Sequence, residues 1–308
     1  MDQVKIFTPA SVANVSCGFD VLGFCLEPVG DEMVIRKVES SGLKITKIVG
    51  ESLPLDVKKN VAGLAAEAIL KAHPQKAGFE IEIYKNIKAG SGIGSSAASA
   101  AGAVFGINEL LGKPFTAHEL IAFAMEGEAL ASGSAHADNV APVLMGGITL
   151  VRSINPIDVI QLPTPKELTA VILHPKIELK TMHAREIIKK NVTMEKAIQQ
   201  WGNLGAFVSA LFNEDYGLMS RSLKDEIIEP VRSLLIPEFD SLKKASISAG
   251  ALGFGISGSG PSVYALTKGI KTAQKVSKAI DEIISPIGID FEIHLSNIND
   301  QGIKILSN

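Results

Sequence analysis

The chain has 308 residues, of which 46% are apolar and 20% charged, and its formal net charge is −3. This composition is typical of a globular protein with one large domain or, as we expect, two of ordinary size. The slightly negative charge, the few aromatic residues and the lack of a basic stripe argue against a dedicated nucleic-acid-binding protein. The N-terminal sequence lacks the apolar core of a signal peptide, and no apolar run reaches the roughly 18 residues of a membrane span. Two cysteines without a CxxC pattern favour a reducing compartment, so we expect a cytoplasmic protein.

The first half of the chain mixes strand and helix patterns. Alternating apolar residues predict strands over residues 5–10, 31–38, 43–49, 79–87 and 146–153. Helical periodicity predicts helices over residues 60–73, 95–112 and 116–132.

The second half begins after a proline-rich stretch, residues 154–168, which we expect to cross between domains 1–160 and 161–308. Beyond it, strands are predicted over residues 168–174, 254–259, 262–267 and 289–295. Helices are predicted near residues 185–213, 238–250 and 270–285. Strands separated by helices indicate an α+β fold.

A glycine-rich turn, residues 90–94, lies between a predicted strand and a helix that begins near Ser95. A helix N-terminus presents unpaired N–H groups and a partial positive charge, which favours anions. Glycines before it allow the backbone to approach a ligand, because no Cβ intervenes. The pattern therefore predicts a phosphate-binding loop.

Other interpretations of this loop remain possible. A Walker loop requires a lysine after the glycines, and none follows here. Gly92, Gly94 and Ala97 match the dinucleotide pattern GxGxxA, but no strand ending in an acidic residue follows about 20 residues later. A glycine- and alanine-rich helix entry without any ligand is a third possibility.

Three stretches in register resemble the motifs of the GHMP family of small-molecule kinases. They are TPASVANVSCGFDVLGFCLE at residues 8–27, GSGIGSSAA at residues 90–98 and FGISGSGPSVYAL at residues 254–266. The amino-acid sequence of these motifs is most similar to that of the homoserine kinases of the family. Residues 133–147, 180–185 and 229–237 also resemble the patterns of those enzymes.

The sequence departs from the family pattern at three places. Most relatives read Leu-Gly-Pro at positions 15–17, where this chain has Val-Ser-Cys, and carry proline at the position of Lys88. Glu238 stands where glycine is usual. The first change could alter the shape of the substrate loop.

The resemblance implies a fold and an activity. The expected fold has an N-terminal domain like the second domain of ribosomal protein S5 and a C-terminal ferredoxin-like domain, with ATP bound between them. The expected activity is Mg²⁺-dependent transfer of a phosphoryl group from ATP to the hydroxyl of L-homoserine, a step in threonine biosynthesis. The alternative hypotheses are a family member that acts on mevalonate or shikimate, a non-catalytic metabolite sensor, and a dinucleotide-binding oxidoreductase.

The resemblance also implies which residues hold the nucleotide. Ser96 and Glu128 are expected to supply oxygen ligands to Mg²⁺. Glu128 taken alone would be interpreted as a solvated helix residue. The ATP-binding residues are expected to be Asn60, Lys88, Ala89, Gly90, Ser91, Gly92, Ile93, Gly94, Ser95, Ser96, Ala97, Ala98 and Thr181.

Homoserine presents an ammonium and a carboxylate besides its hydroxyl, so its site needs an acid, a fork-shaped cation and polar groups. Two of the chain's five arginines fall at the family's substrate positions. Taken alone, either arginine could form a surface ion pair, His136 could be structural, and the last glycine stretch could be a tight connection. The residues expected to bind homoserine are Asn14, Asp20, His136, Arg185, Arg232 and Gly258.

Asn139 falls where several other family members carry a catalytic aspartate. An amide cannot accept a proton at neutral pH, so the resemblance implies a mechanism without a strong base. We expect Asn139 to orient the hydroxyl and the phosphate, and the neighbouring Asp138 to be structural. A homodimer is possible.

Overall fold

The computed structural model describes residues 2–74, 77–132, 136–177, 179, 187–188 and 191–306. Thr181 and Arg185, both expected in the site, lie outside the described residues. Within these ranges no helix is both long and apolar enough to cross a membrane.

The first sheet has seven strands, in the order β11-β1-β2-β4-β3, with β5 pairing with both β2 and β6. Strands β3 and β4 are parallel, and the other pairs are antiparallel. β2 is long because it pairs first with β1 and β5 and then with β1 and β4. The strands are β1 Gln3–Val15, β2 Gly18–Val38, β3 Gly42–Val49, β4 Gly78–Tyr84, β5 Ile148–Ile154, β6 Ile157–Leu162 and β11 Lys304–Ile305.

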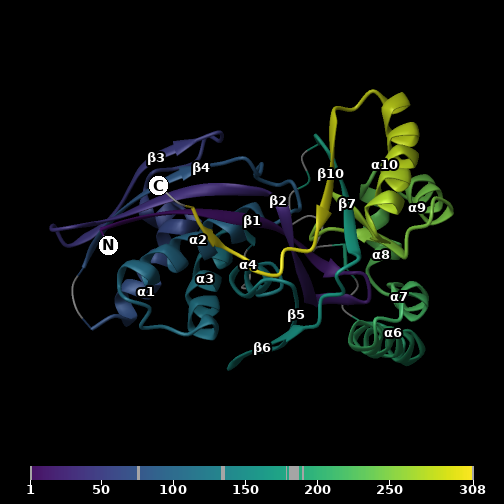
Figure 1. The fold of residues 1–308 in the computed structure, drawn as a ribbon, viewed down its shortest axis with the longest axis horizontal. Helices are drawn as coiled ribbons and strands as arrows, with labels where there is room; N and C mark the ends of the chain where they lie inside the picture. Colours follow the sequence, from purple (N-terminus) through teal and green to yellow (C-terminus); the bar gives the residue numbers. More distant parts are fainter. Residues whose placement is uncertain are drawn as a thin grey trace.

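A layer of helices covers one face of this sheet (Figure 1). Alanines let α1 and α2 pack closely, and together with Ile6, Ile35 and Ile81 of the sheet they form one hydrophobic core. The helices are α1 Val61–Ala72, α2 Ser95–Leu110, α3 Ala117–Ser132 and α4 Val140–Met145.

The second sheet has four antiparallel strands in the order β10-β7-β9-β8. Its strands are β7 Leu168–Pro175, β8 Gly253–Ile256, β9 Val263–Lys268 and β10 Phe291–Asn297. Its helices are α6 Met194–Asn213, α7 Tyr216–Ser222, α8 Glu229–Arg232, α9 Phe239–Ser248 and α10 Ile270–Ile284.

Strand β7 is buried on both faces, and its side chains alternate between two cores. Val171 and Leu173 belong to the core with α9 and α10, whereas Ala170 and Ile172 belong to the core that includes Phe207 of α6. This second core also contains residues of β1 and β2, so it joins the four-stranded sheet to the first one.

The α+β architecture predicted from the sequence is confirmed, with corrections to its elements. Residues 154–168 are not simply a crossing, because β6 folds back on β5 as a hairpin. The strand predicted to start at residue 31 begins at Gly18, since pairing with β1 extends it. The short helices α4, α7 and α8 and the two-residue strand β11 were not predicted from the sequence.

Candidate active site

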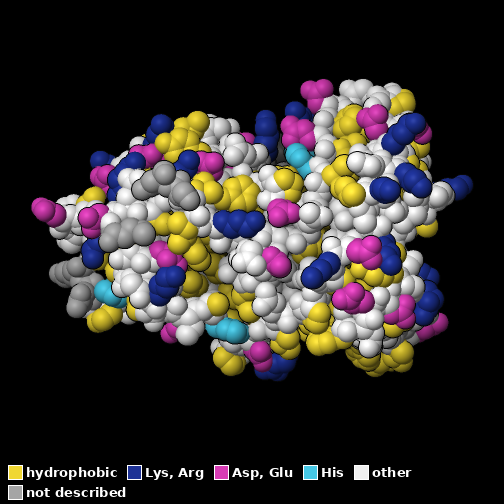
Figure 2. Space-filling model, viewed as in Figure 1, with side chains coloured by type: hydrophobic (Ala, Val, Ile, Leu, Met, Phe, Trp, Pro, Cys, Tyr) yellow, Lys and Arg dark blue, Asp and Glu magenta, His cyan; other side chains and the backbone are white. Residues whose placement is uncertain are grey.

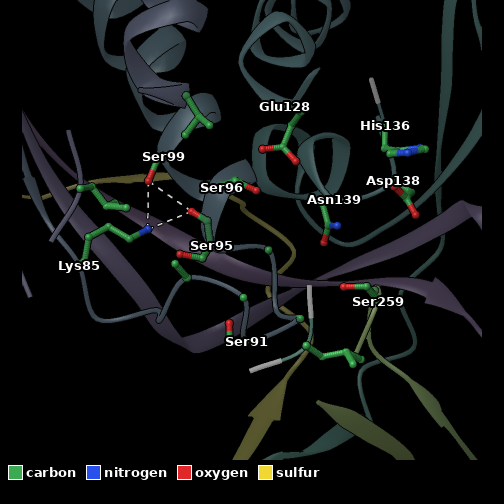
Figure 3. Close-up of a pocket in the computed structure, with 18 of the residues that line it drawn as sticks. Lys85, Ser91, Ser95, Ser96, Ser99, Glu128, His136, Asp138, Asn139 and Ser259 are labelled. Carbon is green, nitrogen blue, oxygen red and sulfur yellow. Dashed lines mark hydrogen bonds between the residues drawn. The ribbon is translucent and has the colours of Figure 1, made fainter. Parts of the chain in front are cut away.

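A cavity of about 530 Å³ brings together the three sequence motifs. Its wall includes the β1–β2 connection, the start of α1, the loop before α2, α3 and the segment before α4. Arg232, Gly258 and Ser259 close it from the second half of the chain. Figure 3 shows Asn139 between the Ser96–Glu128 pair on one side and Asp138 with His136 on the other.

The predicted phosphate loop has the backbone shape that its glycines allow. Gly92 and Gly94 have φ values of 83° and 72°, a region that favours glycine. A Cβ on Gly94 would lie 2.2 Å from Ser11 Oγ, and one on Gly92 would lie 2.7 Å from the carbonyl oxygen of Gly260. Gly94 precedes α2 with no side-chain cap, so the first N–H groups of the helix are left for a ligand.

The second half of the chain holds this loop in place. Ser257 Oγ donates a hydrogen bond to the carbonyl oxygen of Gly92 at 2.7 Å, and Ser262 Oγ donates one to that of Ser91 at 2.6 Å. Both serines are buried, and so is Ser91. The phosphate loop therefore takes its shape from residues more than 150 positions away in the sequence.

A buried ion pair supports the start of α2, directly after the loop. Lys85 Nζ donates to Asp31. It also donates to the carbonyl oxygen of Ser95 at 2.9 Å and to Ser99 Oγ at 3.0 Å (Figure 3). The other carboxylate oxygen of Asp31 accepts the backbone N–H groups of Asn86 and Ile87 at 2.7 and 2.9 Å. With all of its charges paired, this cluster fixes the end of β4 against the start of α2.

Ser96 at the start of α2 and Glu128 of α3 form a pair of hard oxygen donors. Burial raises the pKa of Glu128 to about 7, while a hydrogen bond from Ser96 and the charge of Lys85 oppose the rise. A divalent cation would offset the cost of burying this charge, so the two oxygens fit Mg²⁺. Among the described residues there is no cluster of three or more His, Cys, Asp or Glu that could hold a metal.

The predicted substrate residues of the first motif, Asn14 and Asp20, also line the cavity. Asn14 Nδ2 donates to the carbonyl oxygen of Gly258 at 2.7 Å, and Asn14 Oδ1 accepts the N–H of Asp20 at 2.8 Å. His136 Nδ1 lies 3.7 Å from Asp20 Oδ1. Asn14 thus joins the first and the last motif and positions the Asp20 carboxylate.

Arg232 of α8 also lines the cavity and shares the carbonyl oxygen of Gly258 with Asn14. Its guanidinium stacks on the ring of Phe19 at 5.0 Å, and its Nη1 donates to the carbonyl oxygen of Gly258 at 3.0 Å. The side chain is buried, so its orientation is set before a ligand binds.

Asn139 and Asp138 differ in their surroundings. Asn139 Oδ1 accepts a hydrogen bond from Ser11 Oγ at 2.9 Å, beside Gly94. Asp138 is buried, and burial together with the charge of Asp20 raises its pKa to about 7. A hydrogen bond from the backbone of Asn14 counteracts that rise.

Several expected nucleotide residues lie beside the cavity rather than in its lining. Ile93, Ala97 and Ala98 pack in the hydrophobic cores, and Lys88 is exposed outside the lining. Asn60 lines the cavity, but its amide caps α1 through Ala62 N–H and donates to the carbonyl oxygen of Pro54. The expected residues that line the cavity are Asn14, Asp20, Asn60, Ala89, Gly90, Ser91, Gly92, Gly94, Ser95, Ser96, Glu128, His136, Asn139, Arg232 and Gly258.

At two of the departures from the family pattern the backbone is in a region that favours glycine. Ser16 and Glu238 have φ values of 47° and 54°, the left-handed region in which glycine is favoured. The chain adopts the glycine-like backbone at both positions without glycine.

The sequence alone did not reveal every residue of the lining. Lys85 and Ser99 were not singled out, although Lys85 continues the buried alternation of Phe79, Ile81 and Ile83 along β4. That alternation was the available signal. Leu53, Pro54, Lys59 and Val61 line the cavity near the start of α1 and carried no distinguishing pattern.

The sequence matches two family models that together cover more than half of the chain. The model described as "GHMP kinases N terminal domain" matches residues 58–147, and "GHMP kinases C terminal" matches residues 207–285. A homoserine kinase of Chloroherpeton thalassium is 44% identical over 99% of this chain and 100% of its own length. One of Chlorobaculum tepidum is 43% identical over 100% of this chain and 99% of its own.

Solved structures agree with these matches. The crystal structure of homoserine kinase from Cytophaga hutchinsonii superposes with a TM-score of 0.95 at 48% identity, covering 99% of this chain and 98% of that one. A mevalonate kinase of L. major shares the fold at a TM-score of 0.70 and 16% identity, covering 96% of each chain. The chain belongs to the GHMP kinase family and, within that family, to the homoserine kinases.

Proposed function

We propose that the chain transfers the γ-phosphoryl group of ATP to the side-chain hydroxyl of L-homoserine, giving O-phospho-L-homoserine and ADP. The observation that carries this proposal is a single cavity lined both by an anion-binding helix start and by an acid, Asp20, and an arginine, Arg232. Such an arrangement fits a triphosphate and an amino acid held in the same cavity. In the proposed division of the chain, residues 1–160 carry the phosphate loop, residues 161–308 carry Arg232 and Gly258, and the reaction takes place between them in the cytoplasm.

The phosphates of ATP are proposed to bind the N–H groups of residues 90–96, where the glycines leave the backbone open to a ligand. The adenosine is proposed to lie against Leu53, Pro54 and Asn60 at the start of α1. Asn60 Nδ2 and Oδ1 are both hydrogen-bonded within the chain. This residue would therefore form part of the cavity wall rather than hydrogen-bond to the adenine base. Thr181 remains a proposed nucleotide contact.

Ser96 and Glu128 are proposed to hold Mg²⁺. The bound ion would neutralise negative charge on the phosphates of ATP while the γ-phosphoryl group is transferred. Without the ion, Glu128 with a pKa of about 7 would be partly protonated at neutral pH.

Homoserine is proposed to bind with its ammonium at Asp20 and its carboxylate at Arg232 and Arg185. Arg232 lines the cavity with a buried side chain whose guanidinium stacks on Phe19, and a guanidinium group is suited to two-point binding of a carboxylate. Asn14, His136 and Gly258 would frame the ammonium end. Mevalonate and shikimate have no ammonium group to place at Asp20.

Transfer is proposed to occur in line, without a strong general base. The homoserine oxygen forms a bond to the γ-phosphorus while the bond from that phosphorus to the β–γ bridging oxygen breaks. The hydroxyl proton passes to an oxygen of the transferred group, and the bridging electrons leave with ADP. Asn139, held by Ser11, would orient the hydroxyl toward the phosphate.

An ADP-release assay on the full chain with ATP and Mg²⁺ tests the proposal. Homoserine, serine, threonine, mevalonate and shikimate are offered separately as acceptors, and ³¹P NMR identifies the product. The proposal expects homoserine to have the highest kcat/KM and to yield a phosphomonoester. Preferential phosphorylation of mevalonate or shikimate would contradict it, as would ATP binding without transfer to any acceptor.

A further inference from the structure

Gln200 is a polar residue on the buried face of helix α6. It lies seven positions before Phe207, on the same side of the helix, and it is 8% exposed. The outer side of α6 carries apolar residues instead: Trp201 is 62% exposed, and Figure 2 shows hydrophobic side chains at the lower right edge of the molecule, where Figure 1 places α6. A buried amide on such a helix reverses the usual amphipathic arrangement, and its polar atoms need hydrogen-bond partners within the protein.

The amide of Gln200 is hydrogen-bonded to two separate segments of the chain. Its Nε2 donates to the carbonyl oxygen of Cys17 and to Asp225 Oδ1, both at 3.1 Å. Its Oε1 accepts the backbone N–H of Glu226 at 2.9 Å. Cys17 lies in the connection between β1 and β2, and the other two residues precede α8, so one side chain joins these segments.

Asp225 extends this network to the start of α8. Its Oδ1 accepts the backbone N–H groups of Ile227 and Ile228, each at 3.0 Å. Its Oδ2 accepts the N–H of Glu229, the first residue of α8, at 2.9 Å. A helix of four residues has little stability of its own, so these hydrogen bonds determine where α8 lies and therefore where Arg232, at its end, is placed.

The hydrogen bond to Cys17 falls within a backbone segment of unusual conformation. Ser16 and Asp20 have φ values of 47° and 59°, in the left-handed region that residues other than glycine rarely adopt. Such a backbone persists only when its surroundings hold it. The contact from Gln200 lies between these two residues in the sequence and helps to hold the segment that presents the Asp20 carboxylate.

We propose that Gln200 and Asp225 are positioning residues that set the Asp20 carboxylate and the Arg232 guanidinium at the spacing required to bind homoserine. This inference rests on the proposed function, in which these two groups bind the ammonium and the carboxylate of the substrate. Gln200 and Asp225 are absent from the lining of the active-site cavity, so they act through their neighbours and not by touching the substrate.

The network is separate from the residues proposed to bind ATP. The hydrogen bonds of Gln200 and Asp225 join α6, the β1–β2 connection and the segment before α8, and residues 90–96 take part in none of them. Loss of the network should therefore weaken the binding of homoserine and leave the binding of ATP nearly unchanged.

Steady-state kinetics of the full chain, with homoserine and ATP varied in turn, tests the proposal. Gln200→Met keeps the length of the side chain and removes its three hydrogen bonds, and Asp225→Ala removes the contacts at the start of α8. Each variant is expected to raise the KM for homoserine about tenfold, because charge-assisted hydrogen bonds to the substrate become misaligned. The KM for ATP and kcat should each change by less than about threefold.

Asp215→Ala is the matched control for Asp225→Ala. Asp215 Oδ1 accepts the N–H of Leu218 at 2.9 Å and so caps α7, which contributes no residue to the cavity lining. This control should lower the free energy of unfolding while leaving the KM for homoserine unchanged. Asp225→Asn keeps a side-chain oxygen for the backbone N–H groups and is expected to restore most of the affinity for homoserine.

Circular dichroism checks that each variant is folded, and the two substitutions test the network from opposite ends, so either one decides if the other does not fold. An unchanged KM for homoserine in the folded variants, or an equal rise in the KM for ATP, would overturn the proposal. Either result would leave the proposed kinase activity standing. A wild-type chain that does not phosphorylate homoserine would instead refute the proposed function.

Discussion

Ser262, on the second sheet's side of the molecule, donates a 2.6 Å hydrogen bond to the backbone carbonyl oxygen of Ser91 in the phosphate loop. His174 Nδ1 lies 3.1 Å from the same Ser262 hydroxyl. Burial lowers the pKa of His174, so a neutral imidazole faces the serine near neutral pH. The four-stranded sheet thus helps to set the geometry of a loop that belongs to the other half of the chain.

Removing this hydroxyl should weaken nucleotide binding. Ser262→Ala deletes a hydrogen bond worth about 1 kcal/mol, and we expect the KM for ATP to rise about fivefold with a smaller change in kcat. Thr267→Val is the matched control, because Thr267 also donates a buried hydrogen bond, to the carbonyl oxygen of Thr169, away from the loop. Steady-state kinetics with varied ATP compares the two variants. An equal rise in the KM for ATP in both would show that the hydrogen bond from Ser262 to the loop does not specifically support nucleotide binding.

The buried Lys85–Asp31 pair should stabilise the fold far more than the surface pair between Lys5 of β1 and Glu32 of β2. Lys85→Met leaves Asp31 as a buried charge without its cation and should lower the free energy of unfolding by about 3–5 kcal/mol. Lys5 and Glu32 form an exposed pair at 2.7 Å, and Lys5→Met should cost no more than about 1 kcal/mol. Urea denaturation measures both values. A cost below 1 kcal/mol for Lys85→Met would refute the role given to the pair.

Asp138 should make the stability of the fold depend on pH. Its pKa is raised from 3.8 to about 7, so the folded state favours the protonated carboxyl, and this relative stabilisation is lost as pH rises from about 4 to about 7. Asp138→Asn removes that loss, and its stability relative to wild type should therefore be higher at pH 8 than at pH 5. Denaturant unfolding at both pH values provides the test. If Asp138→Asn changed the free energy of unfolding by the same amount at pH 5 and at pH 8, burial would not be raising the pKa of Asp138.

Asn139 should act in the transfer step. Asn139→Ala is expected to lower kcat about 100-fold, because an orienting group beside the reacting atoms is lost, with little change in the KM for ATP. Asp138→Asn, which alters the neighbouring carboxyl, should retain most of the turnover. The roles would have to be exchanged if Asp138→Asn abolished turnover in a folded protein while Asn139→Ala did not.

The main elements of the fold could be predicted from the sequence because their patterns are local. The alternation in residues 79–87 and the alanine-rich helix after Ser95 depend only on neighbouring residues, and both elements were confirmed. The length of β2 could not be predicted, since its first half is a strand only through pairing with β1 and β5. Short elements such as α8 and β11 likewise depend on tertiary contacts.

The candidate site could be predicted in part, where motifs carry it. Gly92 and Gly94 stood out because they require an unusual backbone, and the structure shows that backbone. The supports of the loop were missed: Ser262 and Lys85 reach it across 171 and 10 residues of sequence, and distant pairing leaves no local pattern. Asp31 and Lys85 both continue the buried side of their strands, so a charge at such a position is the feature to look for.

The central claim is that the backbone at residues 90–96 binds the triphosphate of ATP. A crystal structure of the full chain with Mg²⁺ and a non-hydrolysable ATP analogue tests it most directly. We expect β- and γ-phosphate oxygens within hydrogen-bonding distance of the N–H groups of residues 90–96 and close to Ser96 and Glu128. A nucleotide bound elsewhere, with this loop vacant, would contradict it.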